Sequence, residues 1–151
     1  MTTVICTQKE MAADKRVSWG ENPTFDTLKI FKIKNSIYGY AGDVSASLRF
    51  IKWVEQDFKE APIFDKDDDK DDFNILELTS TGIYLWDKQL SRMPIKSKHY
   101  AIGTGSLLAI YLLDQGLSPR EIIKIISKYD GFTSSEADVI TLRKNKKNET
   151  Y

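Results

Sequence analysis

Cysteine and histidine are almost absent from this sequence of 151 residues, which has one of each, Cys6 and His99. A single cysteine excludes a disulfide framework within the chain and is typical of a protein from a reducing compartment. A single histidine argues against a histidine-based metal cluster. We therefore expect neither a metal nor a cofactor.

The sequence also has no excess of charge of either sign and no long apolar run. Lys and Arg together number 22, as do Asp and Glu, whereas a nucleic-acid-binding protein usually has a basic excess. No stretch approaches the ~20 apolar residues of a membrane span. The N-terminus lacks the basic-then-apolar layout of a signal peptide. We expect a cytoplasmic protein with no nucleic-acid or membrane partner.

The residues that are present suit one compact domain, because 41% are hydrophobic and 29% are charged. We expect this domain to span residues 1–142 and the charged segment 143–151 to form a frayed tail. Apolar runs and the breaker residues between them predict strands and hairpins along the chain. The predicted strands are 2–8, 11–14, 15–19, 28–33, 37–40, 73–78, 83–86, 99–102 and 137–142.

Three helices are expected between these strands. The first follows Asp43 or Ser45 as its cap and ends before Pro62. Its predicted buried face comprises Val44, Leu48, Ile51, Val54 and Phe58. The second, residues 106–115, is apolar nearly all round, which is typical of a helix buried on several sides. The third begins at Ser118 with a capping pattern and runs to about Tyr129. This order predicts a layered α+β sandwich of mostly antiparallel sheets.

One segment, residues 65–72, is strongly acidic. Asp65, Asp67 and Asp69 alternate as in a calcium-binding loop. Lys70 stands where such a loop needs Gly, and Leu76 stands where it needs a bidentate Glu. We interpret the segment as a solvated surface loop.

The start of the chain offers a compact arrangement for nucleophilic chemistry. If Met1 is removed, Thr2 becomes the N-terminal residue and carries both a hydroxyl and a free α-amine. A hydroxyl is a weak nucleophile until a neighbouring base takes its proton. An α-amine titrates near pH ~8, so it can serve as that base. While Met1 is attached, the same nitrogen is an amide and cannot.

Five short motifs follow in order along the chain. They are Asp14-Lys15-Arg16-Val17-Ser18, Lys29-Ile30, Ala41-Gly42-Asp43, Gly103-Thr104-Gly105 and Asp130-Gly131-Phe132-Thr133. Together with the Thr-Thr start, this order resembles the β-type subunits of the proteasome and the bacterial peptidase HslV. Those proteins are N-terminal nucleophile hydrolases. The resemblance extends from Thr2 to about Leu142 and implies their αββα sandwich, with antiparallel sheets and helices on the outer faces.

The resemblance also implies roles for individual residues. Thr2 corresponds to the nucleophile, Lys29 to the catalytic lysine and Asp14 to the buried aspartate beside it. The amide of Gly42 corresponds to the oxyanion donor. Two further sets are implied: Ser18, together with Gly42, for pairing with an extended substrate, and Thr104, Asp130 and Thr133 for holding the Thr2 amine and its water.

Each of these residues, taken alone, also has an ordinary structural explanation. Lys29 can be a solvated strand lysine, and Asp14 a turn residue. Gly42 can simply open a helix, and Thr104 can cap the helix that starts at Ser106. Asp130 can be a residue at a helix end, although a carboxylate there opposes the helix dipole. The order of all five motifs favours the family resemblance.

The function implied is that of a threonine-type peptidase whose sites face the chamber of a homo-oligomeric ring or double ring. Its substrate would be a peptide or an unfolded polypeptide, and an ATPase unfoldase ring is compatible as a partner. Two alternatives stay open. One is a catalytically inactive subunit kept for assembly or binding, with Met1 retained. The other is an amidohydrolase for a small amide, with a closed pocket.

Overall fold

Two antiparallel sheets face each other in the computed structural model, which describes residues 2–19, 22–65 and 70–143. The first sheet has the strand order β10-β1-β2-β11, and the second has the order β5-β6-β7-β8-β9. The strands of the first sheet are β1 (Thr3–Thr7), β2 (Glu10–Asp14), β10 (His99–Gly103) and β11 (Ala137–Thr141). Those of the second are β5 (Ile30–Ile33), β6 (Ser36–Gly42), β7 (Phe73–Thr79), β8 (Gly82–Asp87) and β9 (Arg92–Ile95).

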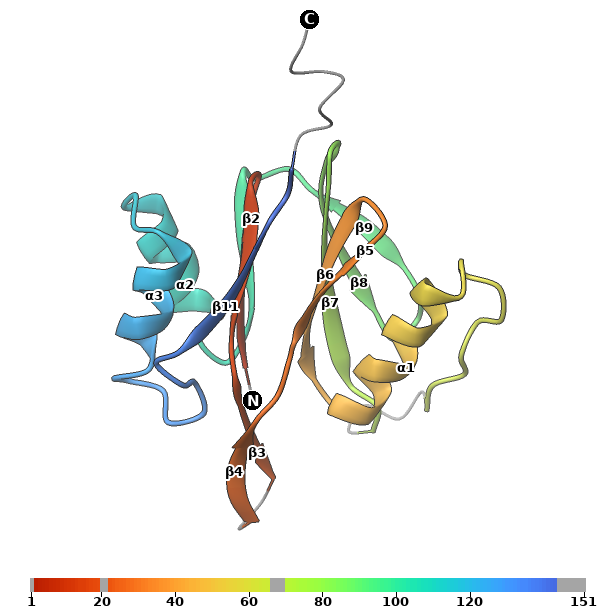
Figure 1. Ribbon diagram of the computed structural model, residues 1–151, viewed down its shortest axis with the longest axis horizontal. Helices are drawn as coiled ribbons and strands as arrows, with labels where there is room; N and C mark the ends of the chain where they lie inside the picture. The colour runs from red at the N-terminus through yellow and green to blue at the C-terminus, as the bar shows by residue number, and fades with distance from the viewer. Residues whose placement is uncertain (1, 20–21, 66–69, 144–151) are drawn as a thin grey trace, which may run out of the picture.

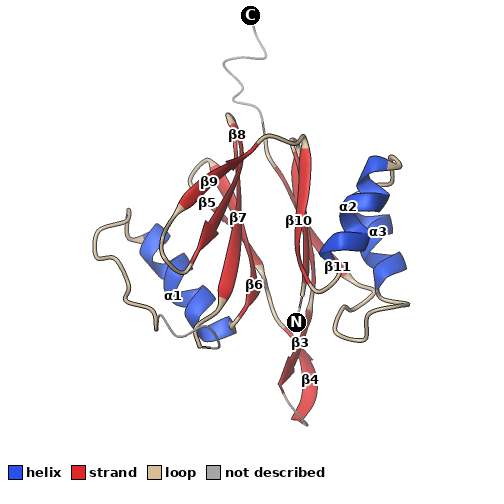
Figure 2. Ribbon diagram, turned by 180° about the vertical axis from the view of Figure 1, so that it is seen from behind, coloured by secondary structure: helices blue, strands red, loops and turns tan. Residues whose placement is uncertain are grey.

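Helices cover the outer face of each sheet (Figures 1 and 2). Helix α1 (Val44–Glu55) packs on β6 and β7, whereas α2 (Ser106–Asp114) and α3 (Pro119–Ile126) pack on β1, β2 and β10. The predicted α+β sandwich, with antiparallel sheets inside and helices outside, is therefore confirmed. A further hairpin, β3 (Arg16–Trp19) and β4 (Asn22–Asp26), extends from the end of the sandwich where the N-terminus lies (Figure 1).

The main core lies between the two sheets. Side chains from β1 and β2, such as Val4, Cys6 and Met11, pack there against Ile30, Leu76 and others from the second sheet. A second apolar cluster fills the space under α1, and a third lies between the first sheet and the pair α2 and α3. No helix among the described residues is long and apolar enough to cross a membrane.

Helix α1 begins as predicted, but its buried face is rotated. The Asp43 side chain caps it by accepting the Ala46 N–H at 2.8 Å. Phe50, which was not among the predicted core positions, is fully buried, while Leu48 is 43% exposed. Phe50 contacts Trp86 and Phe73 with ring centroids 5.2 and 6.0 Å apart. This aromatic cluster sets the rotation of the helix.

Phe58, also predicted in the buried face of α1, lies beyond the helix end at Glu55 and is 41% exposed. The prediction for α2 is wrong in a similar way, since the described part of the chain covers only one side of that helix. Ala109 and Leu113 are buried, but Leu107 is 84% exposed because α2 lies on the outside of the sheet.

Helix α3 has the predicted capping box between Ser118 and Glu121, and it ends at Ile126 rather than near Tyr129. Strands β4 and β9 were not predicted. Both contain a proline, and β9 is an edge strand, where a missing N–H is tolerated. Four residues of the acidic segment, 66–69, and the tail from 144 onward lie outside the described residues.

Candidate active site

Thr2 directly precedes β1 and is paired with the loop that follows β10. Its carbonyl accepts the Thr104 N–H at 2.9 Å, which extends the β1–β10 ladder one residue past the Thr3–Gly103 pair. Gly103 has a φ of +99°, and a Cβ there would lie 1.6 Å from the Thr2 carbonyl oxygen. Only glycine allows this approach, so Gly103 fixes the position of Thr2.

The alternation of side chains along β1 places Thr2 and Thr3 on opposite faces. Thr2 shares its face with Val4, which belongs to the core between the sheets. Thr3 shares its face with Ile5, which packs against the helices, and its hydroxyl lies 2.9 Å from that of Thr133. Thr2, although 3% exposed, thus faces the space between the two sheets.

Asp14 and Lys29 meet beside this strand. Asp14 ends β2 and Lys29 directly precedes β5, and Lys29 Nζ donates to Asp14 Oδ1 at 3.0 Å. The same oxygen accepts the backbone N–H of Thr3 at 3.0 Å. The other carboxylate oxygen accepts the N–H groups of Arg16 and Ser134, each at 3.1 Å. Lys29 Nζ also donates to the Arg16 carbonyl.

Burial governs the electrostatics of Lys29, whose side chain is 1% exposed. Burial lowers the pKa of Lys29 below its usual range, while the charge and hydrogen bond of Asp14 oppose this shift. The ammonium therefore holds its proton less firmly than a surface lysine, and Asp14 fixes its orientation. The interpretation of Lys29 as a solvated lysine is wrong, and so is that of Asp14 as an ordinary turn residue.

The N–H of Gly42 points away from β7. Asp43 N donates to Asp72 O at 2.8 Å, and in an antiparallel ladder the next residue faces the other way. The Gly42 N–H is therefore directed to the side of β6 that carries β5 and Lys29. Gly42 has a φ of +112°, and a Cβ there would lie 2.4 Å from the Asp72 carbonyl oxygen. The backbone conformation and the close approach of Asp72 therefore both require glycine at this position.

Asp130 collects the remaining polar candidates in the loop after α3. Its Oδ2 accepts the hydroxyls of Thr104 at 2.5 Å and Thr133 at 2.9 Å, and its Oδ1 accepts the Phe132 N–H at 3.0 Å. Burial tends to raise the pKa of Asp130, but these hydrogen bonds outweigh it and hold the pKa below its ordinary value. Thr104 does not cap α2, whose N-cap is Gly105.

Hydrogen bonds join six of the predicted residues into one network. The hydrogen bonds described above lead from Lys29 through Asp14, Thr3, Thr133 and Asp130 to Thr104 and the carbonyl of Thr2. Thr3, Ser134 and the Arg16 carbonyl also belong to it, although none of them was predicted as a site residue. The one feature of the sequence that could have pointed to them is that each lies within two positions of a predicted site residue.

Two predicted residues lie outside this network. A cavity of ≈ 440 Å³ borders Gly42, Gly103 and Thr104, so Gly42 is linked to the network by a shared space rather than by a bond. Ser18 lies in the projecting hairpin, at an irregularity where the β3–β4 register shifts between Val17 and Trp19.

Solved structures with the same architecture define the class of fold. Eukaryotic HslV from Trypanosoma brucei matches with a TM-score of 0.71 at 15% identity, over 95% of this chain and 99% of that one. BPH from Thiobacillus denitrificans matches over the same shares, with a TM-score of 0.66 at 15% identity. Anbu, an ancestral β-subunit from Yersinia bercovieri, matches with a TM-score of 0.72 at 10% identity, over 93% of this chain and 81% of that one.

No protein-family model and no curated protein matches the chain. The structural matches show that the chain has an α+β fold of the N-terminal nucleophile, proteasome-like type. Within that type, the resemblance to HslV that the motifs indicated is confirmed at the level of the fold.

Proposed function

We propose that the chain is a threonine-type peptidase in which Thr2, freed by removal of Met1, is the nucleophile. The observation that carries the proposal is the buried Lys29–Asp14 pair, whose carboxylate also binds the N–H next to Thr2. A buried pair of charges is costly to desolvate and contributes little net stability. It is therefore better explained by chemistry beside Thr2 than by folding.

The first half of the reaction forms an ester. The Thr2 α-amine takes the hydroxyl proton as Oγ attacks the peptide carbonyl carbon, and a C–O bond forms. The carbonyl oxygen becomes an oxyanion, which the Gly42 N–H stabilises from the β5 side of β6. We infer that the Lys29 ammonium adds positive charge near Oγ, because the Asp14 carboxylate that it contacts also accepts the N–H next to Thr2. The C–N bond then breaks, and the protonated amine gives its proton to the departing peptide amine.

The second half releases the acyl group. Water attacks the ester carbon, the α-amine takes a proton from that water, and the ester C–O bond breaks as Oγ regains a proton. Thr104, Asp130 and Thr133 hold the α-amine and this water, since their hydroxyl and carboxylate groups meet beside the Thr2 carbonyl. Ser18, in the hairpin next to the N-terminus, supplies backbone for an extended substrate.

The test measures processing and activity together. Intact mass of the purified protein should be lower than the full sequence by one methionine residue. The processed protein should hydrolyse short fluorogenic peptides, and Thr2→Ala should abolish this, whereas Thr141→Ala, an exposed threonine of β11, should leave it unchanged. BPH has been solved in complex with epoxomicin; we expect this chain also to form an adduct with it at Thr2. Equal hydrolysis by Thr2→Ala would remove Thr2 as the nucleophile.

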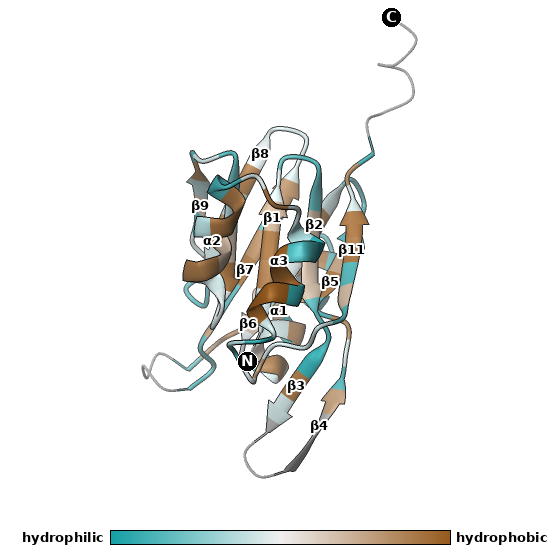
Figure 3. Cartoon of the chain, turned by 90° about the vertical axis from the view of Figure 1, so that its left-hand side faces the viewer, coloured by the Kyte–Doolittle hydropathy of each residue, from teal (hydrophilic) through white to brown (hydrophobic). Residues whose placement is uncertain are grey.

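We further propose that the protein assembles into a homo-oligomeric ring, or a double ring, that encloses these sites. The supporting observation is the outer side of α2, where Leu107 is 84% exposed and Tyr111 is 59% exposed. Figure 3 shows α2 as a largely apolar helix on the surface. Such a patch is typical of an interaction surface. Unfolded polypeptide would enter the ring as substrate, with an ATPase unfoldase ring as a compatible partner.

The same patch favours a second candidate function, that of an inactive subunit kept for assembly or binding, because association needs no nucleophile. This candidate predicts that Met1 is retained and that epoxomicin forms no adduct. The intact-mass measurement separates the two functions.

A further inference from the structure

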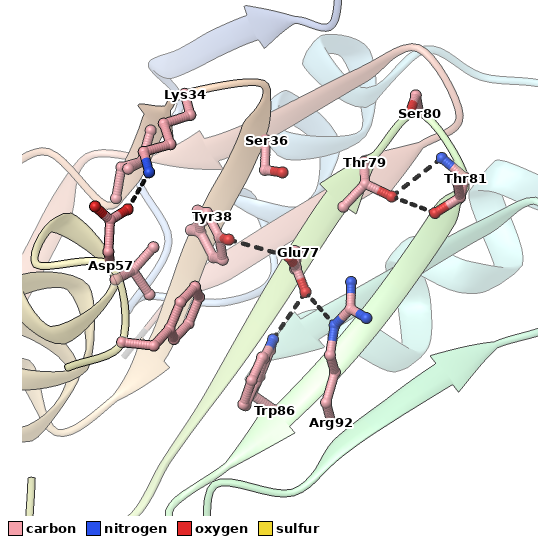
Figure 4. A pocket seen from close by; sticks show the side chains of 13 residues that line it. Lys34, Ser36, Tyr38, Asp57, Glu77, Thr79, Ser80, Thr81, Trp86 and Arg92 are labelled. Carbon is pink, nitrogen blue, oxygen red and sulfur yellow. Dashed lines mark hydrogen bonds and ion pairs between the residues drawn. The ribbon is translucent and has the colours of Figure 1, made fainter. Parts of the chain in front are cut away.

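A second cavity, of ≈ 490 Å³, lies on the outer face of the second sheet, away from Thr2. Residues of β6, β7, β8 and β9 form its floor, and the segment at the C-terminal end of α1 forms one wall (Figure 4). Its size is within the usual range of small-molecule sites. None of the residues assigned to the proposed peptidase site lines it.

A buried carboxylate organises the floor of this cavity. Glu77, on β7, is 4% exposed and accepts three side-chain hydrogen bonds. Its Oε1 accepts Trp86 Nε1 at 2.9 Å and Arg92 Nε at 2.8 Å, and its Oε2 accepts the Tyr38 hydroxyl at 3.0 Å. Figure 4 shows these side chains converging on Glu77. The Glu77 carboxylate therefore holds the three donor side chains, of Trp86, Arg92 and Tyr38, in place.

Arg92 is the group that this arrangement presents to a ligand. Its Nε is fixed by Glu77, and its guanidinium carbon lies 3.6 Å from the centroid of the Tyr84 ring. Because Glu77 binds one edge of the guanidinium and the Tyr84 ring covers one face, the plane of the guanidinium is fixed. Among the described residues, no hydrogen bond uses its Nη atoms, and the side chain is 41% exposed. This leaves a pre-oriented fork of the kind that binds a carboxylate through two parallel bonds.

The other residues that line the cavity indicate what chemistry the rest of the ligand should have. Ile33, Val54, Phe58 and Trp86 supply apolar surface, and hydroxyls of the β7–β8 turn lie near the rim. The charged groups of the lining are Lys34, Asp57, Glu77 and Arg92, so cations and anions balance. Lys34 is already paired with Asp57. A dianion such as phosphate would face two carboxylates with only one fork available, whereas a monoanion needs no more than Arg92.

We propose that this cavity binds a small monocarboxylate with an apolar body, the carboxylate on the Nη fork of Arg92 and the apolar part against Phe58 and Trp86. The proposal is independent of the peptidase function because it concerns a different face of the sheet and is tested by binding rather than by activity.

Titration calorimetry with 3-phenylpropionate tests it directly, with the neutral 3-phenylpropionamide and inorganic phosphate as comparison ligands. The wild type should bind the acid saturably and the amide at least tenfold more weakly, and phosphate should not displace the acid. Arg92→Gln should weaken binding of the acid at least tenfold. Arg49→Gln is the matched control, because Arg49 also stacks on an aromatic ring and pairs with a carboxylate, but lies outside the cavity.

Two further measurements keep the result clear. Arg92→Lys retains the charge but not the fork, so it should also bind the acid several-fold more weakly, with an unchanged circular dichroism spectrum. In the wild type, the indole N–H resonance of Trp86 should shift on addition of the acid. No binding by the wild type, equal affinity for acid and amide, tighter binding of phosphate, or full affinity in Arg92→Gln would each overturn the proposal.

Discussion

Asp14 and Lys29 form an ion pair with an Oδ1–Nζ distance of 3.0 Å although their side chains are only 0% and 1% exposed. The pair joins the two sheets, since Asp14 ends β2 and Lys29 precedes β5. It also anchors the start of β1 through the Thr3 N–H. The same carboxylate oxygen therefore contacts both the start of β1, next to Thr2, and the lysine that precedes the second sheet.

Removing one partner of this pair should be costly. Lys29→Met leaves the Asp14 carboxylate buried without its counter-charge, and we expect a loss of roughly 3–5 kcal/mol in the free energy of unfolding. Lys15→Met is the control, because Lys15 forms partly exposed pairs with Glu136 and Asp138 and should cost at most about 1 kcal/mol. Urea unfolding followed by fluorescence measures both, and similar losses would contradict the assignment.

Asp130 should make stability depend on pH. Hydrogen bonds hold its folded pKa below the unfolded value of ~3.9. Its contribution is therefore complete above that value and is lost as the pH falls through the folded pKa. The wild type should be more stable than Asp130→Asn at pH 7, and the difference should shrink below pH ~3.9. A difference that stays constant down to pH 2 would show that the charge is not involved.

Gly103 should not tolerate a side chain. Gly103→Ala places a methyl group where the Thr2 carbonyl oxygen now lies, so both stability and peptide hydrolysis should fall. Gly116→Ala is a matched control, because Gly116 also has a positive φ, +88°, but no atom of the described residues lies within 4 Å of the added Cβ. Gly116→Ala should lower the free energy of unfolding by only about 1 kcal/mol, the cost of placing a residue with a Cβ at positive φ. Comparing unfolding midpoints and hydrolysis rates separates crowding at Thr2 from backbone strain.

Much of the fold could be predicted because local signals agreed with the tertiary structure. Asp43 and Ser118 are good N-caps in any context, and the runs that became β7 and β8 flank a clear turn. The errors arose where contacts between distant elements determine which side of a helix is buried. Phe50 is buried because Trp86, far along the chain, offers it a surface. Leu107 is exposed because no other element of the described chain covers that side of α2.

The candidate site was predictable only through its residue types and their order. The pairing of Lys29 with Asp14 was expected only through the family resemblance, because the contact joins two sheets and no local pattern along the chain indicates it. Thr3 was given no role, although its N–H contacts Asp14 and its hydroxyl contacts Thr133. Ser134 was not predicted because its contact with Asp14 uses the backbone N–H, which every residue type except proline has, while its hydroxyl accepts the Lys15 N–H.

Cys6 should report global unfolding. It is fully buried between the sheets, and burial raises the pKa of its thiol to about 12, so the reactive thiolate is suppressed in the folded chain. Iodoacetamide at pH 8.5 should label the native protein only as fast as it unfolds. In urea, where the thiol pKa returns to ~8.5, labelling should be rapid. Because the chain has one cysteine, intact mass gives the labelled fraction directly. Rapid labelling of the native protein would mean that the first sheet opens locally.

The exposed side of α2 should drive association of the chain. Leu107 and Tyr111 project from a helix whose other side packs on β10 and α3. A charge at Leu107 would have to be desolvated in any interface formed there. We therefore expect Leu107→Lys to lower the molar mass measured by light scattering after size exclusion. Ile63→Lys is the control, since Ile63 is 90% exposed but lies in the segment after α1. If Leu107→Lys keeps the wild-type mass while Ile63→Lys dissociates, the interface lies on the α1 side of the sandwich instead, and the ring must be built from the second sheet.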